Sequence, residues 1–202
     1  MPTPENGGAW GILGGSFDPV HLGHLNLASE IHSKAGLDGV LLVPAFRHPF
    51  KEACHATFEQ RVEMLTLAAA GCDYLIISEI EKEQDLPGYT LSTVRALKKA
   101  LPMAVFSFLI GEDNLAELNR WHKPDEILTE VPVLVGVRPP GNFTEGTDHG
   151  WSGRVRMIET SPLEASSTRV RELIGKSAPS GQLQRLIPEP VRQYIAARGL
   201  YQ

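Results

Sequence analysis

Short, uninterrupted apolar runs recur along this chain and alternate with stretches whose apolar residues are spaced three and four positions apart. Uninterrupted runs are typical of strands buried on both faces, and the spaced pattern is typical of helices that pack one face against a sheet. The alternation therefore predicts a doubly wound parallel α/β sheet flanked by helices, with ligands at the carboxyl ends of the strands. The predicted strands are Trp10–Leu13, Gly39–Val43, Tyr74–Ile77, Val105–Ile110, Val131–Val137 and Val155–Ile158.

The other periodic stretches predict the helices and the domain organisation. The chain has 202 residues, 42% of them hydrophobic, which is enough for one substantial core, so we expect a single domain over residues 1–202. A small C-terminal helical portion should span about residues 166–202. The turn-rich stretch Pro139–Ser152 lacks periodicity and is expected to form a mobile loop. The predicted helices are Leu22–Lys34, Phe58–Ala70, Leu91–Ala100, Asn114–Leu118, Arg169–Ile174 and Val191–Arg198.

Charge and cysteine content narrow the class of protein. The net charge of −5 argues against a broad basic surface for nucleic acid, so a phosphate site must be a local positive pocket. Cys54 and Cys72 lie eighteen positions apart without a C-x-x-C pair, which predicts reduced thiols in a cytoplasmic protein. No apolar run is long enough to span a membrane, so no membrane partner is expected.

The segment from Gly14 to His24, with the sequence GGSFDPVHLGH, carries the strongest indication of chemistry. Gly14 and Gly15 follow a predicted strand and let a ligand come close to the main chain. Gly23 opens a helical stretch, and the amides of a first helical turn favour anions. His21 and His24 are three positions apart, so both imidazoles share one helix face and each can donate a hydrogen bond to phosphate oxygens. The segment therefore predicts a polyphosphate site.

Two other interpretations of the histidine pair stay open. The pair could bind zinc, although no nearby Cys or acidic residue at regular ligand spacing completes such a site. The two residues could also be core histidines with satisfied hydrogen bonds at a strand-to-helix junction.

With its paired histidines, the segment Gly14–His24 resembles the H-x-G-H signature of the nucleotidyltransferase superfamily. The downstream segment Ala165–Arg171, ASSTRVR, is similar to the second half of that signature, I-S-S-T-x-x-R, with alanine in place of isoleucine. The resemblance implies a Rossmann-like fold that holds a nucleoside triphosphate. By its own chemistry, the Ser-Ser-Thr run should cap the helix Arg169–Ile174, and Arg171 offers a forked donor to phosphates. A plain helix cap with a solvated arginine is the alternative.

Segments between these two motifs resemble bacterial nicotinate-nucleotide adenylyltransferases in order and spacing. Phe50 stands where that family often has histidine, and Gly88 and Ser92 are further departures from its motifs. The matching segments are Val43–Pro44 with Pro49–Lys51, Gly88–Arg95, Phe108–Leu115 with Arg120–His122, and Val137–Pro139.

The resemblance implies roles for residues in these segments. Gly111 and Asp113 would lie by the ribose of ATP. Lys51 would reach the phosphate of the acceptor nucleotide, and Trp121 would stack on its pyridine ring. Thr90 and Arg138 would complete the nicotinate nucleotide site. The alternatives are a solvated loop lysine for Lys51, a helix cap for Thr90, a partly buried hydrophobe for Trp121 and an ion pair with a surface carboxylate for Arg138.

The implied reaction is attack by the 5′-phosphate of nicotinate mononucleotide on the α-phosphorus of ATP, a step of NAD biosynthesis. His24 and His21 would steady the charge at the α-phosphate, with Mg²⁺ carried by ATP and no separate metal site. The polyphosphate would be held by Arg171, Thr168, Ser167, Ser16 and the Gly14–Phe17 backbone.

Other functions stay open. The acceptor could instead be nicotinamide mononucleotide or pantetheine phosphate, or the chain could be a non-catalytic nucleotide-binding regulator. Assembly into a homo-oligomer is also left open.

Overall fold

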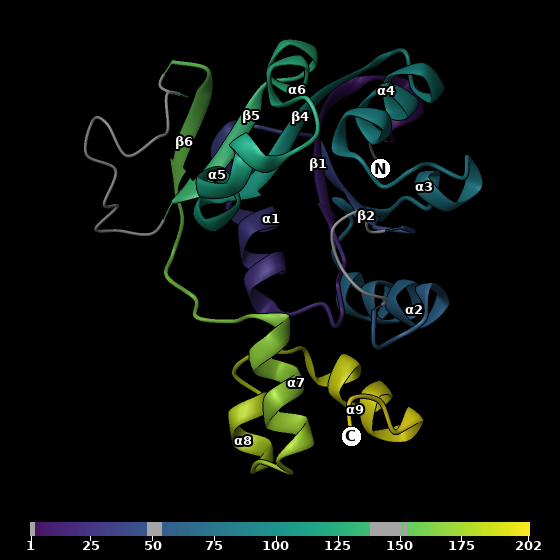
Figure 1. Ribbon diagram of the computed structural model, residues 1–202, viewed down its shortest axis with the longest axis vertical. Coiled ribbons are helices and arrows are strands. Elements are labelled where there is room, and N and C mark those ends of the chain that lie inside the picture. The colour runs from purple at the N-terminus through teal and green to yellow at the C-terminus, as the bar shows by residue number, and fades with distance from the viewer. Residues whose placement is uncertain (1–2, 48–53, 138–150, 152) are drawn as a thin grey trace.

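The computed structural model describes residues 3–47, 54–137, 151 and 153–202. Its six strands form one parallel sheet in the order β3-β2-β1-β4-β5-β6, which confirms the predicted fold class (Figure 1). The strand order reverses between β1 and β4, and ligands of such sheets bind in the crevice outside the carboxyl ends of strands at that point. The strands are β1 (Gly8–Gly15), β2 (Gly39–Pro44), β3 (Leu75–Ile77), β4 (Ala104–Gly111), β5 (Val133–Val137) and β6 (Val155–Glu159).

Helices cover both faces of this sheet. One face is packed by α1 (Leu22–Ala35), α2 (Phe58–Ala69), α7 (Ser167–Gly175) and α9 (Glu189–Arg198), with the short α8 (Ser180–Leu183) beside them. The other face is packed by α3 (Ile80–Glu83), α4 (Thr90–Ala100), α5 (Glu112–Glu117) and α6 (Pro124–Glu130). Two 3₁₀ turns, η1 (Pro4–Asn6) and η2 (Leu118–Arg120), complete the described elements.

Neighbouring residues of a strand enter opposite cores. Leu41 packs in the cluster under α4 and Leu42 in the cluster under α1, because successive side chains of a strand point to opposite faces. Val170 of α7 and Val191 of α9 belong to the same cluster as Leu42. The C-terminal helices therefore pack on the core of the sheet, at the end of the molecule where the colour in Figure 1 turns from green to yellow.

Several element boundaries differ from the prediction. The strand expected at Val131 begins at Val133, because α6 occupies the residues up to Glu130. Likewise α5 begins at Glu112 and α7 at Ser167, each two residues before its predicted start. The short helices α3, α6 and α8 were not predicted at all. Of the expected loop Pro139–Ser152, only Trp151 lies among the described residues.

Among the described residues, no helix is both long and apolar enough to cross a membrane.

Candidate active site

The turn after β1 places its glycines at the carboxyl edge of the sheet, where the strand order reverses. Gly14 is exposed and Gly15 half-buried, and both end the strand before Ser16. The main-chain oxygen of Ser16 accepts a hydrogen bond of 2.7 Å from Arg61, which fixes the direction of the turn. Phe17 has a left-handed backbone (φ 48°), and its buried ring meets the His24 ring edge-on at 4.8 Å. Only the backbone of Phe17, not its side chain, is thus available to a triphosphate.

His21 and His24 cap the start of α1 reciprocally. The Nδ1 atom of His21 accepts from the His24 amide, and the Nδ1 atom of His24 accepts from the His21 amide, both at 3.3 Å. The two rings stack with centroids 3.6 Å apart. Since each Nδ1 accepts a hydrogen, the proton of each neutral ring must lie on Nε2. Each imidazole therefore keeps one Nε2–H group as a donor.

Burial keeps both histidines uncharged at neutral pH. It lowers the pKa of His21 to about 4. It also lowers the pKa of His24 well below its ordinary value, with a further contribution from the charge that His21 would carry. Two uncharged imidazoles can donate hydrogen bonds to phosphate oxygens without adding positive charge.

The space beside the pair is tight, because a Cβ on Gly23 would lie 2.9 Å from Nδ1 of His21.

The first amides of α1 are less available than the sequence predicts. The Leu22 amide donates to the carbonyl oxygen of Leu186 at 2.7 Å. The His24 amide is occupied by His21, as described above. The prediction that the amides of this first turn face an anion is therefore wrong for these two residues. The Nε2–H groups of His21 and His24 are further donors at this helix start.

The second motif contacts the first across 148 positions of sequence. The Ser167 hydroxyl donates to the carbonyl oxygen of Pro19 at 2.8 Å. Nη1 of Arg171 donates to the carbonyl oxygen of Asp18 at 2.6 Å. The half-buried Arg171 is thereby held beside the turn that leads to the histidine pair.

The cap of α7 differs from the prediction. Ser166 alone is the N-cap, and its hydroxyl accepts from the Arg169 amide at 3.1 Å, so the prediction that the whole Ser-Ser-Thr run caps a helix starting at Arg169 is wrong. Ser167 uses its hydroxyl hydrogen on Pro19. Thr168 accepts from Arg171 at 3.3 Å, a contact that uses the hydroxyl oxygen and not the hydrogen. Thr168 is therefore the better phosphate donor of these two hydroxyls.

The carboxyl end of β4, the strand that pairs with β1, carries two more of the predicted site residues. Gly111 ends this strand, and Asp113 lies in the first turn of α5, not before the helix as predicted. A Cβ on Gly111 would lie 2.7 Å from Oδ1 of Asp113, so the carboxylate folds back over the glycine. Asp113 is exposed and can accept hydrogen bonds from ribose hydroxyls.

Contacts between aromatic rings connect the segments that carry Thr90 and Trp121, the described residues predicted to bind the nicotinate nucleotide. The half-buried Trp121 meets Phe108 edge-on at 6.0 Å, so it does pack on the core. The Tyr89 and His122 rings stack at 4.3 Å and join the start of α4 to the segment after η2. Thr90 is the first residue of α4, but the N-cap is Tyr89, so a capping role for Thr90 is wrong. Thr90 and Trp121 thus come from segments that meet.

Two predicted ligand contacts fall outside the described residues. Lys51 and Arg138 belong to the segments 48–53 and 138–150, so their roles stay predictions.

Two buried polar residues at this edge were missed by the sequence reasoning. Asp18 was interpreted only as part of a turn, yet it is 4% exposed and is bonded to three other segments. Arg61 is 3% exposed and joins the turn after β1 to the end of β2 through Ser16 and Ala45. The only local sequence feature that pointed to Asp18 was the Asp-Pro turn. Arg61 lies within the helical pattern of α2, where an arginine is normally expected on the exposed face.

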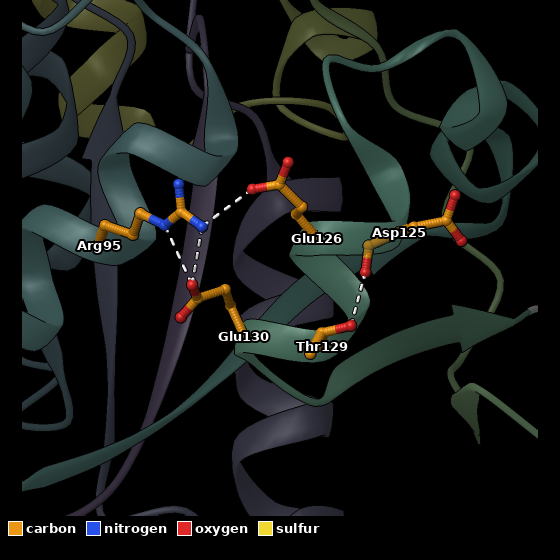
Figure 2. A pocket seen from close by; sticks show the side chains of 5 residues that line it. All are labelled: Arg95, Asp125, Glu126, Thr129 and Glu130. Atoms are coloured by element: carbon orange, nitrogen blue, oxygen red, sulfur yellow. Dashed lines mark hydrogen bonds and ion pairs between the residues drawn. The ribbon is translucent and has the colours of Figure 1, made fainter.

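Two surface hollows lie away from these residues. One, of about 230 Å³, lies between α4 and α6, where Arg95 reaches the carboxylates of Glu126 and Glu130 (Figure 2). The other, of about 380 Å³, lies among α7, α8 and α9 and includes Ile174 and Leu200. Neither is lined by a predicted site residue. The first is an exposed ion-pair bridge between two helices.

Comparison with known proteins agrees with this geometry. Residues 12–173 match the cytidylyltransferase-like family. A relative from Exiguobacterium sibiricum, named a probable nicotinate-nucleotide adenylyltransferase, is 34% identical over 193 aligned positions, covering 95% of this chain and 97% of the relative. A relative of the same name from Treponema pallidum is 37% identical over 204 aligned positions, covering 94% and 97%.

The fold is also found in a solved structure. The Plasmodium falciparum nicotinic acid mononucleotide adenylyltransferase complexed with NaAD matches with a TM-score of 0.78 at 17% identity, covering 96% of this chain and 97% of that one. Because its sequence matches the cytidylyltransferase-like family and these relatives over most of its length, this chain belongs to the nicotinate-nucleotide adenylyltransferase family of the cytidylyltransferase-like proteins.

Proposed function

We propose that this chain transfers the adenylyl group of ATP to nicotinate mononucleotide, giving nicotinate adenine dinucleotide and pyrophosphate in NAD biosynthesis. Besides family membership, one structural observation supports the proposal. The hydrogen bonds from Ser167 and Arg171 to the carbonyls of Pro19 and Asp18 join the two motifs at the carboxyl end of β1. A polyphosphate at that point can be bound by both motifs at once.

In the reaction, an oxygen of the acceptor 5′-phosphate forms a bond to the α-phosphorus of ATP. The bond from that phosphorus to the bridging oxygen breaks, and pyrophosphate leaves with the electron pair. The nucleophile is already ionised, so the protein needs only to align the reactants and stabilise charge. The Nε2–H groups of His21 and His24 are fixed donors for the oxygens of the α-phosphate.

The other site residues have separate proposed tasks. Arg171 and Thr168 bind the pyrophosphate portion, and Ser167 holds α7 in place through Pro19. Asp113 accepts from the ATP ribose, and Trp121 offers a face to the pyridine ring. The remaining proposed ligand contacts are Gly14, Gly15, Ser16, Gly111, Thr90, Lys51 and Arg138.

We propose that magnesium enters with ATP. Mg²⁺ is commonly held through substrate phosphates while it keeps several waters, and there it would neutralise charge on the leaving pyrophosphate. In the part of the chain that the structure describes, no group of three or more His, Cys, Asp or Glu side chains is placed to hold a metal ion.

We propose a cytoplasmic location because of the state of the two cysteines. Cys54 and Cys72 are both free thiols, which suits a reducing compartment.

A turnover assay tests the function. The purified protein is incubated with ATP, Mg²⁺ and, in separate reactions, nicotinate mononucleotide, nicotinamide mononucleotide or pantetheine phosphate, while pyrophosphate release is followed. We expect the highest kcat/KM with nicotinate mononucleotide. No turnover with either pyridine nucleotide would refute the proposal, and ATP binding without any turnover would favour a regulator.

A further inference from the structure

The carboxylate of Asp18 lies where three distant segments meet. Its Oδ2 accepts from the His55 amide at 2.8 Å, and its Oδ1 accepts from the Ala56 amide at 3.1 Å. The hydroxyl of Tyr201 donates to Oδ1 at 2.8 Å, across 183 positions of sequence. One buried carboxylate thus joins the turn after β1, the segment before α2 and the segment after α9.

A buried carboxylate is costly unless its hydrogen bonds are satisfied. Burial by itself would raise the pKa of Asp18, but the hydrogen bonds from His55, Tyr201 and Ala56 outweigh it and lower the pKa below its ordinary value. Among the described residues, the imidazole of His55 is the one basic side chain within ion-pair distance of the carboxylate, with Nδ1 at 3.3 Å from Oδ2. Asp18 is therefore kept ionised mainly by neutral donors.

The main chain of the same residue holds the phosphate-binding arginine. The carbonyl oxygen of Asp18 accepts from Nη1 of Arg171 at 2.6 Å. The next carbonyl, that of Pro19, accepts from Ser167. His21 follows two residues later. A shift of the Asp18 backbone would therefore move Arg171 relative to the histidine pair.

Tyr201 is held in an unusual conformation for this contact. Its backbone is left-handed (φ 65°), a conformation that residues other than glycine rarely adopt. Burial and the bond to Asp18 raise the pKa of its hydroxyl, so the group stays protonated and donates. The positive charges of Arg171 and Arg61 also act on this hydroxyl. The hydroxyl of Tyr201 is thus directed at Asp18 from the segment after α9.

We propose that Asp18 and Tyr201 form a positioning pair for the adenylyl transfer, in which the Tyr201 hydroxyl orients Asp18 and the Asp18 backbone sets Arg171 against the triphosphate. This inference rests on the proposed function, because its kinetic test measures adenylyl transfer. Neither residue touches the reacting atoms in this arrangement. Their effect is transmitted through the carbonyl oxygen of Asp18 to the guanidinium of Arg171.

The variant Tyr201→Phe tests the pair, because it removes only the hydroxyl. We expect kcat/KM for ATP to fall about 10-fold, the size of one lost hydrogen bond of about 1.4 kcal/mol. The KM for nicotinate mononucleotide should stay within about twofold, because Trp121 and Thr90 lie on other elements. Affinity for inorganic pyrophosphate, measured by titration calorimetry, should fall in parallel with kcat/KM for ATP.

Tyr194→Phe is the matched control. Tyr194 lies on α9, packs against the same core as Tyr201, and its hydroxyl is bonded to Glu63. This variant should keep its kinetics at the wild-type level, because its hydroxyl is bonded to Glu63 of α2 and not to Asp18. If Tyr201→Phe loses stability but keeps the wild-type kcat/KM for ATP, measured well below its unfolding temperature, the positioning role is overturned.

Two further measurements keep the inference testable. In an Asp18→Asn background, Tyr201→Phe should lower kcat/KM for ATP by much less than in the wild type, since the two changes act on one contact. Equal effects in both backgrounds would overturn the pairing. If the wild type itself shows no turnover, the proposed function fails, but ATP binding still tests the pair. Equal ATP affinity of wild type and Tyr201→Phe would then overturn it.

Discussion

At the scale of single residues, His21 and His24 serve the backbone and the site at the same time. Each Nδ1 atom satisfies an amide at the start of α1, and this contact leaves Nε2 as the protonated nitrogen. Because burial lowers both pKa values, we propose that the pair acts as two neutral donors to the polyphosphate. In this proposal the positive charge at the polyphosphate comes from other groups, with Arg171 among them.

The variant His24→Ala separates these two tasks only in part. We expect turnover to fall at least about 10²-fold, because a donor to the developing charge is lost. The helix start should also lose about 0.5–2 kcal/mol, because the His21 amide loses its acceptor. Steady-state kinetics and urea unfolding measure the two effects.

His24→Gln is the control for that variant. Glutamine at the third helical position can accept from the N-cap amide, so stability should return most of the way to that of the wild type. Turnover should stay low, because the imidazole Nε2–H is absent. Full recovery of turnover would contradict the catalytic role of the ring.

The lowered histidine pKa also predicts how stability depends on pH. The unfolded His21 binds a proton near pH 6.5, whereas in the folded chain its pKa is about 4. Between these values the unfolded state binds more protons, so the free energy of unfolding should fall as the pH drops from 6.5 towards 4. His24 acts in the same direction, and its pKa is also lowered.

Urea unfolding at a series of pH values checks this expectation. Glu81 acts in the opposite direction, because burial raises its pKa, so a comparison with His21→Asn is needed to isolate the histidine contribution. Asparagine keeps an acceptor at the N-cap. The variant should lose less stability than the wild type between pH 6.5 and 5. An identical pH dependence in both proteins would rule out a neutral buried His21.

At the scale of elements, α2 supports the site from beneath through one buried side chain. Arg61 donates to the carbonyl of Ser16 at 2.7 Å and to that of Ala45 at 2.8 Å. These carbonyls follow β1 and β2, so a single helix holds two neighbouring turns at the carboxyl edge of the sheet. The turn that carries Gly14 and Gly15 is thereby oriented from outside its own sequence.

Replacing this arginine should destabilise the fold and disturb ATP binding. Arg61→Met keeps much of the packing but removes two charge-assisted hydrogen bonds, which should cost about 2–4 kcal/mol of unfolding free energy. We also expect a raised KM for ATP. Arg198→Met, on the exposed end of α9, is the control and should change neither quantity appreciably. Unaltered stability of Arg61→Met in urea would refute the support role.

The elements also explain which parts of the fold the sequence can predict. All six strands were predicted because short runs dominated by apolar residues mark them, even though Arg156 lies inside the last one, and the long helices were predicted because their pattern repeats over several turns. The four-residue α3 and α8 are too short for any periodicity. The two site motifs were visible because the members of each lie close together in sequence: the glycines and histidines of Gly14–His24 in one, and the Ser-Ser-Thr run with Arg171 in the other. Tyr201 was not, because its bond to Asp18 spans 183 positions and leaves no local pattern.

At the scale of the whole molecule, the sheet and the C-terminal helices share one apolar cluster. Val170, Val191 and Ile195 pack in the same core as Leu13 and Leu42. Hydrogen bonds from Tyr201 and Arg171 add polar contacts between the same two parts. An opening of the C-terminal helices would therefore expose apolar surface of the sheet.

We accordingly expect a single cooperative unfolding transition. Tryptophan fluorescence reports mainly on the core beneath α4, which contains Trp10 and Trp151, whereas far-ultraviolet circular dichroism reports on all helices. The two signals should give the same midpoint in urea. Separate midpoints would show that residues from about 166 to 202 unfold as an independent domain.

The strand order places the two proposed substrate regions on opposite faces of one sheet. Arg171 is anchored on the face covered by α1, and Trp121 packs on the face covered by α4. Gly14 ends β1 beside the ring of Phe108, which Trp121 contacts, and it is exposed and without a side chain. An inhibitor built by linking mimics of both substrates would have to arch over this glycine, so its linker should be curved and slender at the midpoint, and a bulkier residue at position 14 would be a direct route to resistance.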